Sequence, residues 1–137
     1  INIGIATETD EGLIVSVLRR ANEKSLAEIA TIRADLVTRA RERKLALDEI
    51  SGSTFTISNF GAFGIQEGDP ILNPPESAIH CISSLLDKPV VIGGEIKVRP
   101  IMKLTIAIDH RVLDGISGGR FLMRVKELIE QPPPVLS

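Results

Sequence analysis

The sequence is poor in aromatic residues and has no excess of basic charge. It contains four Phe and neither Trp nor Tyr, so its core must be aliphatic, and it offers few surfaces on which bases or sugars could stack. It contains 16 Lys and Arg and 18 Asp and Glu, which gives a formal net charge of −2. This balance argues against nucleic acid and membranes as partners. The one basic cluster, residues 39–44, ends a predicted helix, where cations complement the helix dipole.

Cysteine and long apolar runs are also scarce. The single cysteine, Cys81, cannot form an internal disulfide, which favours a reducing compartment. No apolar run approaches the ~18 residues of a membrane span, and no signal-peptide pattern is visible. The chain opens without Met on Ile1-Asn2-Ile3, already in a strand-like alternation. We therefore expect that further residues precede Ile1 in the native protein.

The rest of the composition is typical of a folded domain. Hydrophobic residues make up 43% and charged residues 25%, which argues against disorder. A chain of this length can bury roughly two-thirds of the surface that its unfolded form exposes. Repeats, low-complexity segments and linkers are not apparent. We therefore expect residues 1–137 to belong to a single domain.

Hydrophobic spacing in the first half predicts a hairpin, a helix and a strand. Residues 1–6 and 13–18 are β-rich, with turn-forming residues between them. Ser25 and Glu28 form a capping-box pattern at the start of a helix over about 25–43 with one apolar face. A short β-branched strand over 54–58 is followed by 61–75, where Gly and Pro predict a loop.

The second half predicts further strands and a final helix. The strands are expected over 77–83, 89–92, 95–99 and 102–108, with Gly93-Gly94 as a hairpin turn between the middle two. A helix over 117–131 carries an apolar face and is stopped by Pro132-Pro133-Pro134. Together these elements predict an α+β fold, a mixed or antiparallel sheet packed on two long helices.

The segment Asp109-His110-Arg111-Val112-Leu113-Asp114-Gly115 carries the clearest chemical signal. Charged residues directly follow an apolar strand there, and the end of a strand is where a rigid scaffold presents reactive groups. An imidazole can take and return a proton near neutral pH, and a carboxylate four residues later can orient the ring or brace the loop. By pattern alone, a lone His with an Asp at this spacing is more often structural than catalytic.

This segment, followed by Gly119-Arg120-Phe121-Leu122, resembles the active-site signature of the dihydrolipoamide acyltransferases. These are the core subunits of 2-oxoacid dehydrogenase complexes. Two further stretches match the family, Thr54-Phe55-Thr56-Ile57-Ser58-Asn59-Phe60-Gly61 and Asn73-Pro74-Pro75-Glu76-Ser77-Ala78-Ile79. The resemblance runs from Ile1 to Leu136. It implies the coenzyme A-dependent acyltransferase fold that the family shares with chloramphenicol acetyltransferase, in the C-terminal portion of the catalytic domain.

The resemblance also implies a role for each of three residues. His110 corresponds to the base that deprotonates the attacking thiol of coenzyme A or dihydrolipoamide. Ser58 corresponds to the hydroxyl that donates a hydrogen bond to the tetrahedral oxyanion. Asp114 corresponds to the second acid of the motif and is expected to support the loop and the ring geometry. A free thiol is mostly protonated at neutral pH, so a positioned base raises the fraction of thiolate at the moment of attack.

Several of these residues also have simpler interpretations. A serine that closes a strand before Asn-Phe-Gly is commonly a turn former, so Ser58 depends on the resemblance for its catalytic role. Cys81 has apolar neighbours and is expected to be a buried structural thiol. His80 and Cys81 alone do not make a zinc site, which usually needs at least three protein ligands. Gly115, Gly118 and Gly119 lack P-loop spacing and are expected to serve a turn and helix packing.

The expected function is acyl transfer between dihydrolipoamide and coenzyme A, with acetyl as the first expectation and branched-chain acyl and succinyl behind it. Coenzyme A and a lipoyl group carried on another domain are then the substrates, and no metal is expected. The implied partners are other copies of the chain in a trimer-based core, with serine and histidine from different chains, and the decarboxylase and dihydrolipoamide dehydrogenase components. The implied compartment is the cytoplasm or the mitochondrial matrix.

Some features depart from the family pattern. The first part of the family's catalytic domain has no counterpart here, and Ser16 stands where the family commonly has Pro. The loop Gln66-Glu67-Gly68-Asp69 is unusually polar. These departures leave two alternatives open: a catalytically incomplete scaffold module of such a complex, and a free-standing acetyltransferase for a small molecule. They also lead us to expect little activity from the 137-residue chain alone.

Overall fold

Alternating Ile residues begin the chain with a hairpin, as their spacing predicts. In the computed structural model, which describes residues 1–133, β1 (Ile3–Thr9) pairs antiparallel with β2 (Gly12–Leu18). Thr9 lies opposite Gly12, so Asp10 and Glu11 form a two-residue turn. Gly12 has φ +124°, a conformation that residues with a side chain rarely adopt.

The predicted capping box starts the first helix. α1 (Leu26–Arg41) follows Ser25, whose hydroxyl accepts a hydrogen bond from the Glu28 backbone N–H. The helix buries Leu36 and Ala40. In the basic cluster, Arg39 does more than complement the helix dipole. Its guanidinium binds both Glu49 carboxylate oxygens, at 2.6 and 2.7 Å, and lowers the pKa of Glu49 to about 2. This pair fastens the short 3₁₀ helix η2 (Leu47–Ile50) to α1; another, η1 (Ala21–Glu23), precedes α1.

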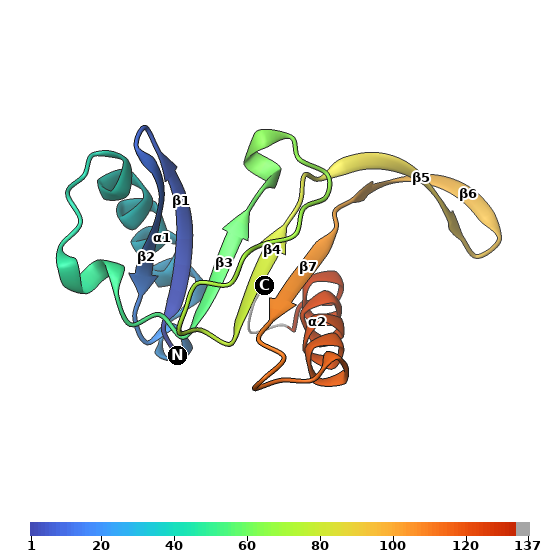
Figure 1. Ribbon diagram of the computed structural model, residues 1–137. Helices are drawn as coiled ribbons and strands as arrows, with labels where there is room; N and C mark the ends of the chain where they lie inside the picture. The colour runs from blue at the N-terminus through green and yellow to red at the C-terminus, as the bar shows by residue number, and fades with distance from the viewer. Residues whose placement is uncertain (134–137) are drawn as a thin grey trace.

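The main sheet is mixed, which decides between the two predicted alternatives. Its five strands lie in the order β2-β1-β3-β4-β7, with β3 (Phe55–Asn59), β4 (Ala78–Ile82) and β7 (Leu104–Ile108). The three central strands β1, β3 and β4 are parallel, and each outer strand pairs antiparallel with its neighbour. The order and the two helices give the expected α+β fold (Figure 1).

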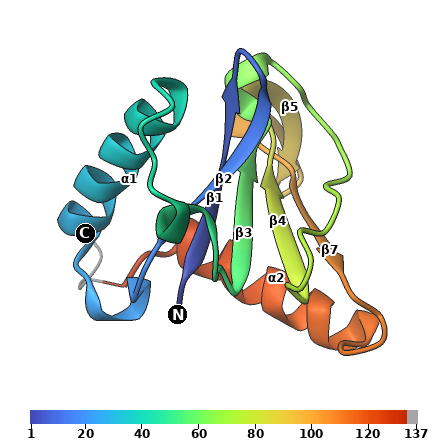
Figure 2. The ribbon, with the colours of Figure 1, turned by 60° about the vertical axis from the view of Figure 1, so that its left-hand side comes forward.

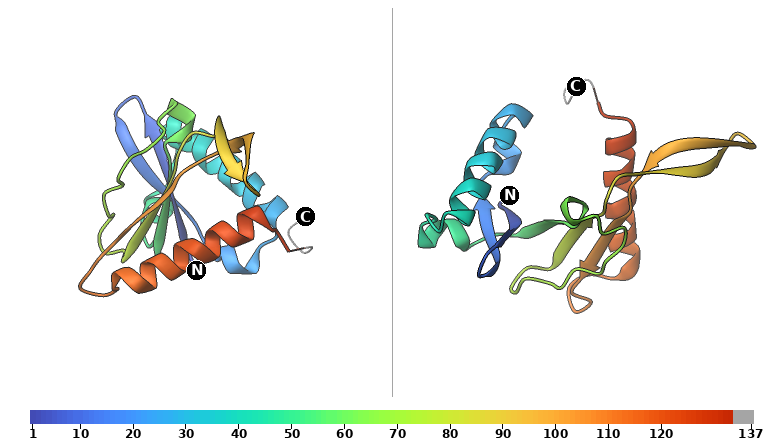
Figure 3. Two further views of the ribbon diagram at one scale, coloured as in Figure 1. Left: turned by 90° about the vertical axis from the view of Figure 1, so that its right-hand side faces the viewer. Right: turned by 90° about the horizontal axis from the view of Figure 1, so that it is seen from above.

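The two faces of this sheet are covered differently. Phe55, Ile57 and Asn59 face the two helices: the first lines a cavity with residues of α2 (Gly115–Glu130), and the others line one with residues of α1. The right-hand view of Figure 3 shows both helices on one side of the sheet, and Figure 2 shows α1 beside the β1–β2 edge. The intervening Thr56 and Ser58 face the other way, where the loop after β3 crosses the sheet. That loop begins with η3 (Gly61–Phe63).

The predicted Gly-Gly hairpin forms an arm rather than part of the main sheet. Within residues 1–133, β5 (Leu86–Ile92) and β6 (Glu95–Ile101) pair only with each other, and they project from the body (Figure 1). Gly93 and Gly94 have φ +61° and +83°, as a two-residue turn of this kind requires. The arm exposes apolar side chains, including Val91 at 71% and Ile96 at 78%.

The final helix packs on the end of the sheet nearest β7. Phe121 lies against Phe55 of β3, with ring centroids 5.5 Å apart. A Cβ at Gly118 would lie 3.3 Å from Ile108, so the predicted packing role holds there, whereas Gly115 and Gly119 have open space around them. The last proline predicted to stop this helix, Pro134, lies outside the described residues. Neither helix in residues 1–133 has the length and apolarity needed to cross a membrane.

Candidate active site

Ser58 lies inside the molecule, on the central strand β3. Its side chain is 7% exposed and that of Thr56, two residues earlier on the same face, is fully buried. Across the sheet Ser58 is aligned with Cys81, which in turn is aligned with Thr105 of β7. The β-branched residues of this segment form the strand, and the period of two turns its hydroxyl residues to the face opposite the helices.

A cavity of about 370 Å³ opens beside Ser58. Apolar side chains of β1, β2 and β4 form its walls, and the loop after β3 roofs it with Phe60 and residues 69–73. The polar groups along it are Thr56, Ser58 and Asn73. Asp69 is the one charged residue among the described residues that line this cavity. The site can therefore hold an extended, mostly apolar group against a single hydroxyl donor.

Glu76 fastens the roof of this cavity to its floor. One carboxylate oxygen, Oε1, accepts hydrogen bonds from Ser53 Oγ, from Thr56 Oγ1 at 2.9 Å and from Asn73 Nδ2 at 2.9 Å. Glu76 is buried, and its other oxygen, Oε2, has no partner within residues 1–133. Gly4 allows this arrangement, because a Cβ there would collide with Thr56 Oγ1. The sequence placed Glu76 within the Asn73–Ile79 motif but did not indicate this structural role.

His110 occupies a turn at the end of β7 and is exposed. The turn begins at Asp109, whose N–H donates to the Ser77 carbonyl at 2.8 Å and whose own carbonyl accepts from Val112 and Leu113. The Arg111 guanidinium binds the Asp109 carboxylate, at 2.6 Å between Nη2 and Oδ2, and lowers the pKa of Asp109 to about 2. The charges on either side of His110 are thus paired with each other, which leaves the imidazole free to meet a ligand.

Asp114 is the N-cap of α2. Its Oδ1 accepts a hydrogen bond from the Ser117 N–H at 2.7 Å, and this bond is the main reason that the pKa of Asp114 is lowered. The positive charge of a protonated His110 makes a smaller contribution in the same direction. No hydrogen bond joins Asp114 to His110 within residues 1–133. The expected support of the loop thus has a concrete form, a helix cap, and the ring of His110 is influenced by Asp114 through charge alone among the described residues.

The structure does not bring Ser58 and His110 together within one chain. His110 follows Thr105, the residue level with Ser58, by five positions, or up to about 17 Å along the strand. Two strand spacings add about 10 Å across the sheet. The separation is therefore of the order of 20 Å, and Figure 1 shows β3 and β7 ending at opposite rims of the sheet.

Cys81 and His80 are the other two residues that the sequence singled out. Cys81 is buried, as expected, and burial raises the pKa of its thiol, with a further rise from the negative charge of Asp69. His80 faces the helices instead; burial lowers its pKa, and its Nδ1 is buried with no partner among residues 1–133. Within residues 1–133, His, Cys, Asp and Glu side chains form no group of three that could hold a metal ion.

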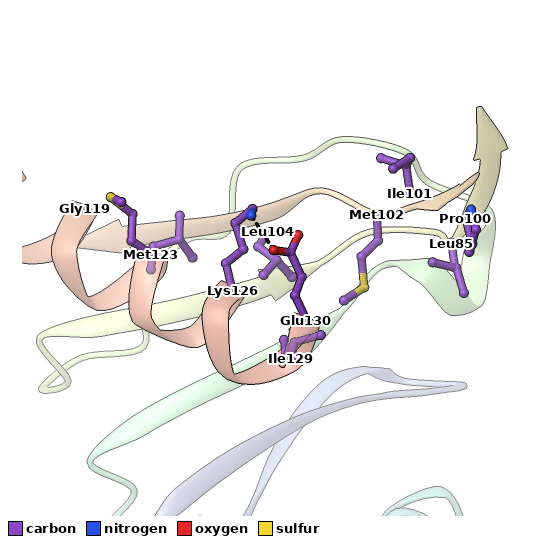
Figure 4. Close-up of a pocket in the computed structure, with 11 residues that line it drawn as sticks. Leu85, Pro100, Ile101, Met102, Leu104, Gly119, Met123, Lys126, Ile129 and Glu130 are labelled. Carbon is purple, nitrogen blue, oxygen red and sulfur yellow. Dashed lines mark hydrogen bonds and ion pairs between the residues drawn. The ribbon is translucent and has the colours of Figure 1, made fainter. Parts of the chain in front are cut away.

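A larger groove of about 700 Å³ lies elsewhere, between α2 and the base of the β5–β6 arm (Figure 4). Its walls are mostly apolar and include Met102, Leu104 and Met123, beside an ion pair of 2.6 Å between Lys126 and Glu130. None of Ser58, His110 and Asp114 lines it. Its size therefore carries no weight in locating the chemistry, which needs a base and a donor.

Two curated proteins illustrate what the sequence is similar to. The model of the 2-oxoacid dehydrogenases acyltransferase catalytic domain matches residues 1–136. A dihydrolipoyllysine-residue acetyltransferase component of pyruvate dehydrogenase complex from Acholeplasma laidlawii is 46% identical over 99% of this chain. A dihydrolipoyllysine-residue succinyltransferase component of 2-oxoglutarate dehydrogenase complex from Rickettsia typhi is 42% identical over 98% of it. The chain spans only 25% and 34% of the lengths of these two proteins.

Two solved structures resemble the fold closely. The dihydrolipoamide acetyltransferase of Azotobacter vinelandii and the cubic core of a pyruvate dehydrogenase multienzyme complex each superpose with a TM-score of 0.93 at 36% identity, covering all of this chain and 56% of theirs. The first was studied for the catalytic role of a serine, a histidine and an asparagine. Those three residues have the same separations in sequence as Ser58, His110 and Asp114 here.

Proposed function

Because this chain belongs to the family of 2-oxoacid dehydrogenase acyltransferase catalytic domains, we propose that it supplies Ser58, His110 and Asp114 to an acyl-transfer site. The reaction moves an acyl group, acetyl in the first place, between dihydrolipoamide and coenzyme A. Both thiol compounds are substrates, and the lipoyl group is carried on a part of the protein outside this chain. The observation that carries the proposal is that one chain holds both a buried hydroxyl beside an apolar cavity and, at a strand end, an exposed imidazole.

The proposed reaction needs one base and one hydrogen-bond donor. His110 takes the proton of the attacking thiol, and the sulfur forms a bond to the thioester carbonyl carbon. The electron pair of the carbonyl moves to its oxygen, where the Ser58 hydroxyl donates a hydrogen bond to the developing charge. The intermediate then collapses, the original carbon–sulfur bond breaks, and the leaving thiolate takes the proton back from His110. Since the whole exchange consumes one thiol and releases another, its atoms and electrons balance without an oxidant.

The separation of Ser58 and His110 supports a site assembled from two chains. A distance of the order of 20 Å cannot be closed by side-chain rotation, whereas the donor and the base must both reach one thioester. We therefore propose a homo-oligomer, based on trimers, in which one copy supplies Ser58 and its neighbour supplies His110. The decarboxylase and dihydrolipoamide dehydrogenase components are the further proposed partners, in the cytoplasm or the mitochondrial matrix.

Mixed oligomers of the complete protein test this proposal directly. Ser58→Ala and His110→Ala chains would each lose most of their activity alone, and both would be assayed for acyl transfer from acetyl-coenzyme A to dihydrolipoamide. After co-assembly in equal amounts, about one site in four would combine an intact Ser58 with an intact His110 from different chains. Recovery of activity is the expected result, and a mixture as inactive as its parents would contradict the two-chain site. A wild-type core that assembles but does not turn over would instead indicate a scaffold module.

A further inference from the structure

The cavity beside Ser58 has a polarity that bears on which acyl group it accepts. Its walls offer Val15, Leu72 and Ile79 to an aliphatic group, and its described lining contains no basic side chain. The single charge there is that of Asp69, in the roof loop. Glu76 adds a second carboxyl close by, because it binds two of the lining residues, Thr56 and Asn73.

The backbone on both sides of Asp69 is packed against the molecule, although Asp69 itself is exposed. Pro70 is buried, and Gly68 lies so close to the Phe60 ring that a Cβ there would be 2.6 Å from Cε2. Phe60 itself follows Ser58 by two residues, so the roof loop and the strand are tied together. The charge of Asp69 acts on the Ser58 face of the sheet. Burial is the main reason that the pKa of Cys81 is raised, and the negative charge of Asp69 raises it further; Cys81 is aligned with Ser58.

Nothing in the described residues neutralises this charge. Asp69 forms no ion pair within residues 1–133, whereas Lys103, a basic residue that reaches the same loop, is already paired with Glu67. An acyl group that ends in a carboxylate would therefore bring a second negative charge beside Asp69 and would lose water in a cavity that offers it no cation. An acetyl or branched aliphatic group would meet only the apolar walls.

We propose that Asp69 is a specificity-determining residue, which rejects acyl groups carrying a negative charge and leaves the Ser58 cavity to uncharged ones. This inference rests on the proposed acyl-transfer function and adds to it the chemical class of the acyl group. Overall sequence identity does not distinguish between acyl groups, since this chain is 46% identical to an acetyltransferase component and 42% identical to a succinyltransferase component.

The experiment compares two acyl donors on the complete protein in its assembled form. Steady-state kcat/KM would be measured with acetyl-coenzyme A and with succinyl-coenzyme A, each with dihydrolipoamide as acceptor. We expect the wild type to favour acetyl. Asp69→Asn should raise the succinyl-to-acetyl ratio of kcat/KM roughly three- to fivefold, the upper part of the range of one exposed charge interaction. Asp69→Lys should raise it further. Added salt should shrink the difference between wild type and Asp69→Asn, because salt screens exposed charges and a merely structural change would not respond.

Asp48→Asn serves as the matched control, because Asp48 is also an exposed aspartate but lies on η2, outside the cavity. It should leave the ratio unchanged. A wild type that uses succinyl-coenzyme A as well as acetyl-coenzyme A would overturn the inference, as would an Asp69→Asn ratio within twofold of the wild type. Failure of the intact protein with every acyl donor would overturn the proposed function itself, and the inference would fall with it.

Discussion

Ser58 and His110 lie in opposite surroundings, although the same reaction is proposed for both. Ser58 is buried on a central strand, under a loop that Glu76 joins to the strand through hydrogen bonds from Ser53 and Thr56. His110 is exposed on a turn at the far rim, between an ion pair and a helix cap. One chain thus completes the surroundings of the donor, whereas the surroundings of the base remain open. This difference agrees with the proposed site shared between two copies, in which a second chain would complete the surroundings of His110.

The largest effect should come from the open side of this comparison. His110→Ala removes the proposed general base, and such a base contributes roughly 10²–10⁴ in rate. The fold should persist, because His110 is exposed and its turn is held by bonds of Asp109 and Asp114. Steady-state acyl transfer by the complete protein measures the loss, with thermal unfolding as the check on folding. A variant within threefold of the wild type would remove His110 from the mechanism.

A smaller loss should come from the buried side. Ser58→Ala removes one donor to the oxyanion, which should lower kcat by roughly 10²-fold while KM changes little, since the bond strengthens only as charge develops. Thr56→Ser offers a matched control on the same face, because it keeps the hydroxyl that binds Glu76. If Ser58→Ala raised KM and left kcat unchanged, Ser58 would be a binding residue and not the donor to the oxyanion.

Substitutions of Asp114 distinguish a role as a helix cap from a role in a catalytic triad. Asp114→Asn keeps an oxygen for the Ser117 N–H and should cost less than about fivefold in kcat/KM, whereas loss of a true triad acid costs about 10⁴. An asparagine at the same spacing in the Azotobacter vinelandii enzyme agrees with this expectation. Asp114→Ala should destabilise the fold by about 1 kcal/mol through loss of the cap. Equal rate losses in Asp114→Asn and His110→Ala would revive the triad.

The smallest effect concerns stability rather than rate, on the face opposite Ser58. Burial lowers the pKa of His80, so the unfolded chain binds more protons than the folded one in mild acid. The stability is full above the ordinary histidine pKa of about 6.5 and falls as the pH drops below it. His80→Leu should therefore raise the unfolding midpoint of the complete protein more at pH 5.5 than at pH 8. An equal gain at both values would mean that His80 is not held neutral by burial.

Local patterns were sufficient for most of the secondary structure, whereas the candidate site residues Ser58 and His110 depended on the resemblance to a family. The Ser25–Glu28 capping box, the Asp-Glu turn and the alternation around Ser58 depend on neighbours a few positions apart, and each formed as predicted. Strand ends were less certain: β1 extends to Thr9, β5 begins at Leu86, and β7 begins at Leu104 rather than Met102. Pairing partners decide where a strand ends, and these come from distant parts of the chain.

The sequence by itself determined which elements form, that they make an α+β fold, and which serine and histidine belong to the motifs. Only the tertiary structure decided that the sheet is mixed, that the β5–β6 hairpin stands apart from it, and that Ser58 and His110 end up at opposite rims. It alone placed Asp69 at the Ser58 cavity and buried Glu76 Oε2 with no partner among the described residues. The physical reason is range: periodicity and capping act within a few residues, whereas register, burial and the field of a charge depend on groups that only folding brings together.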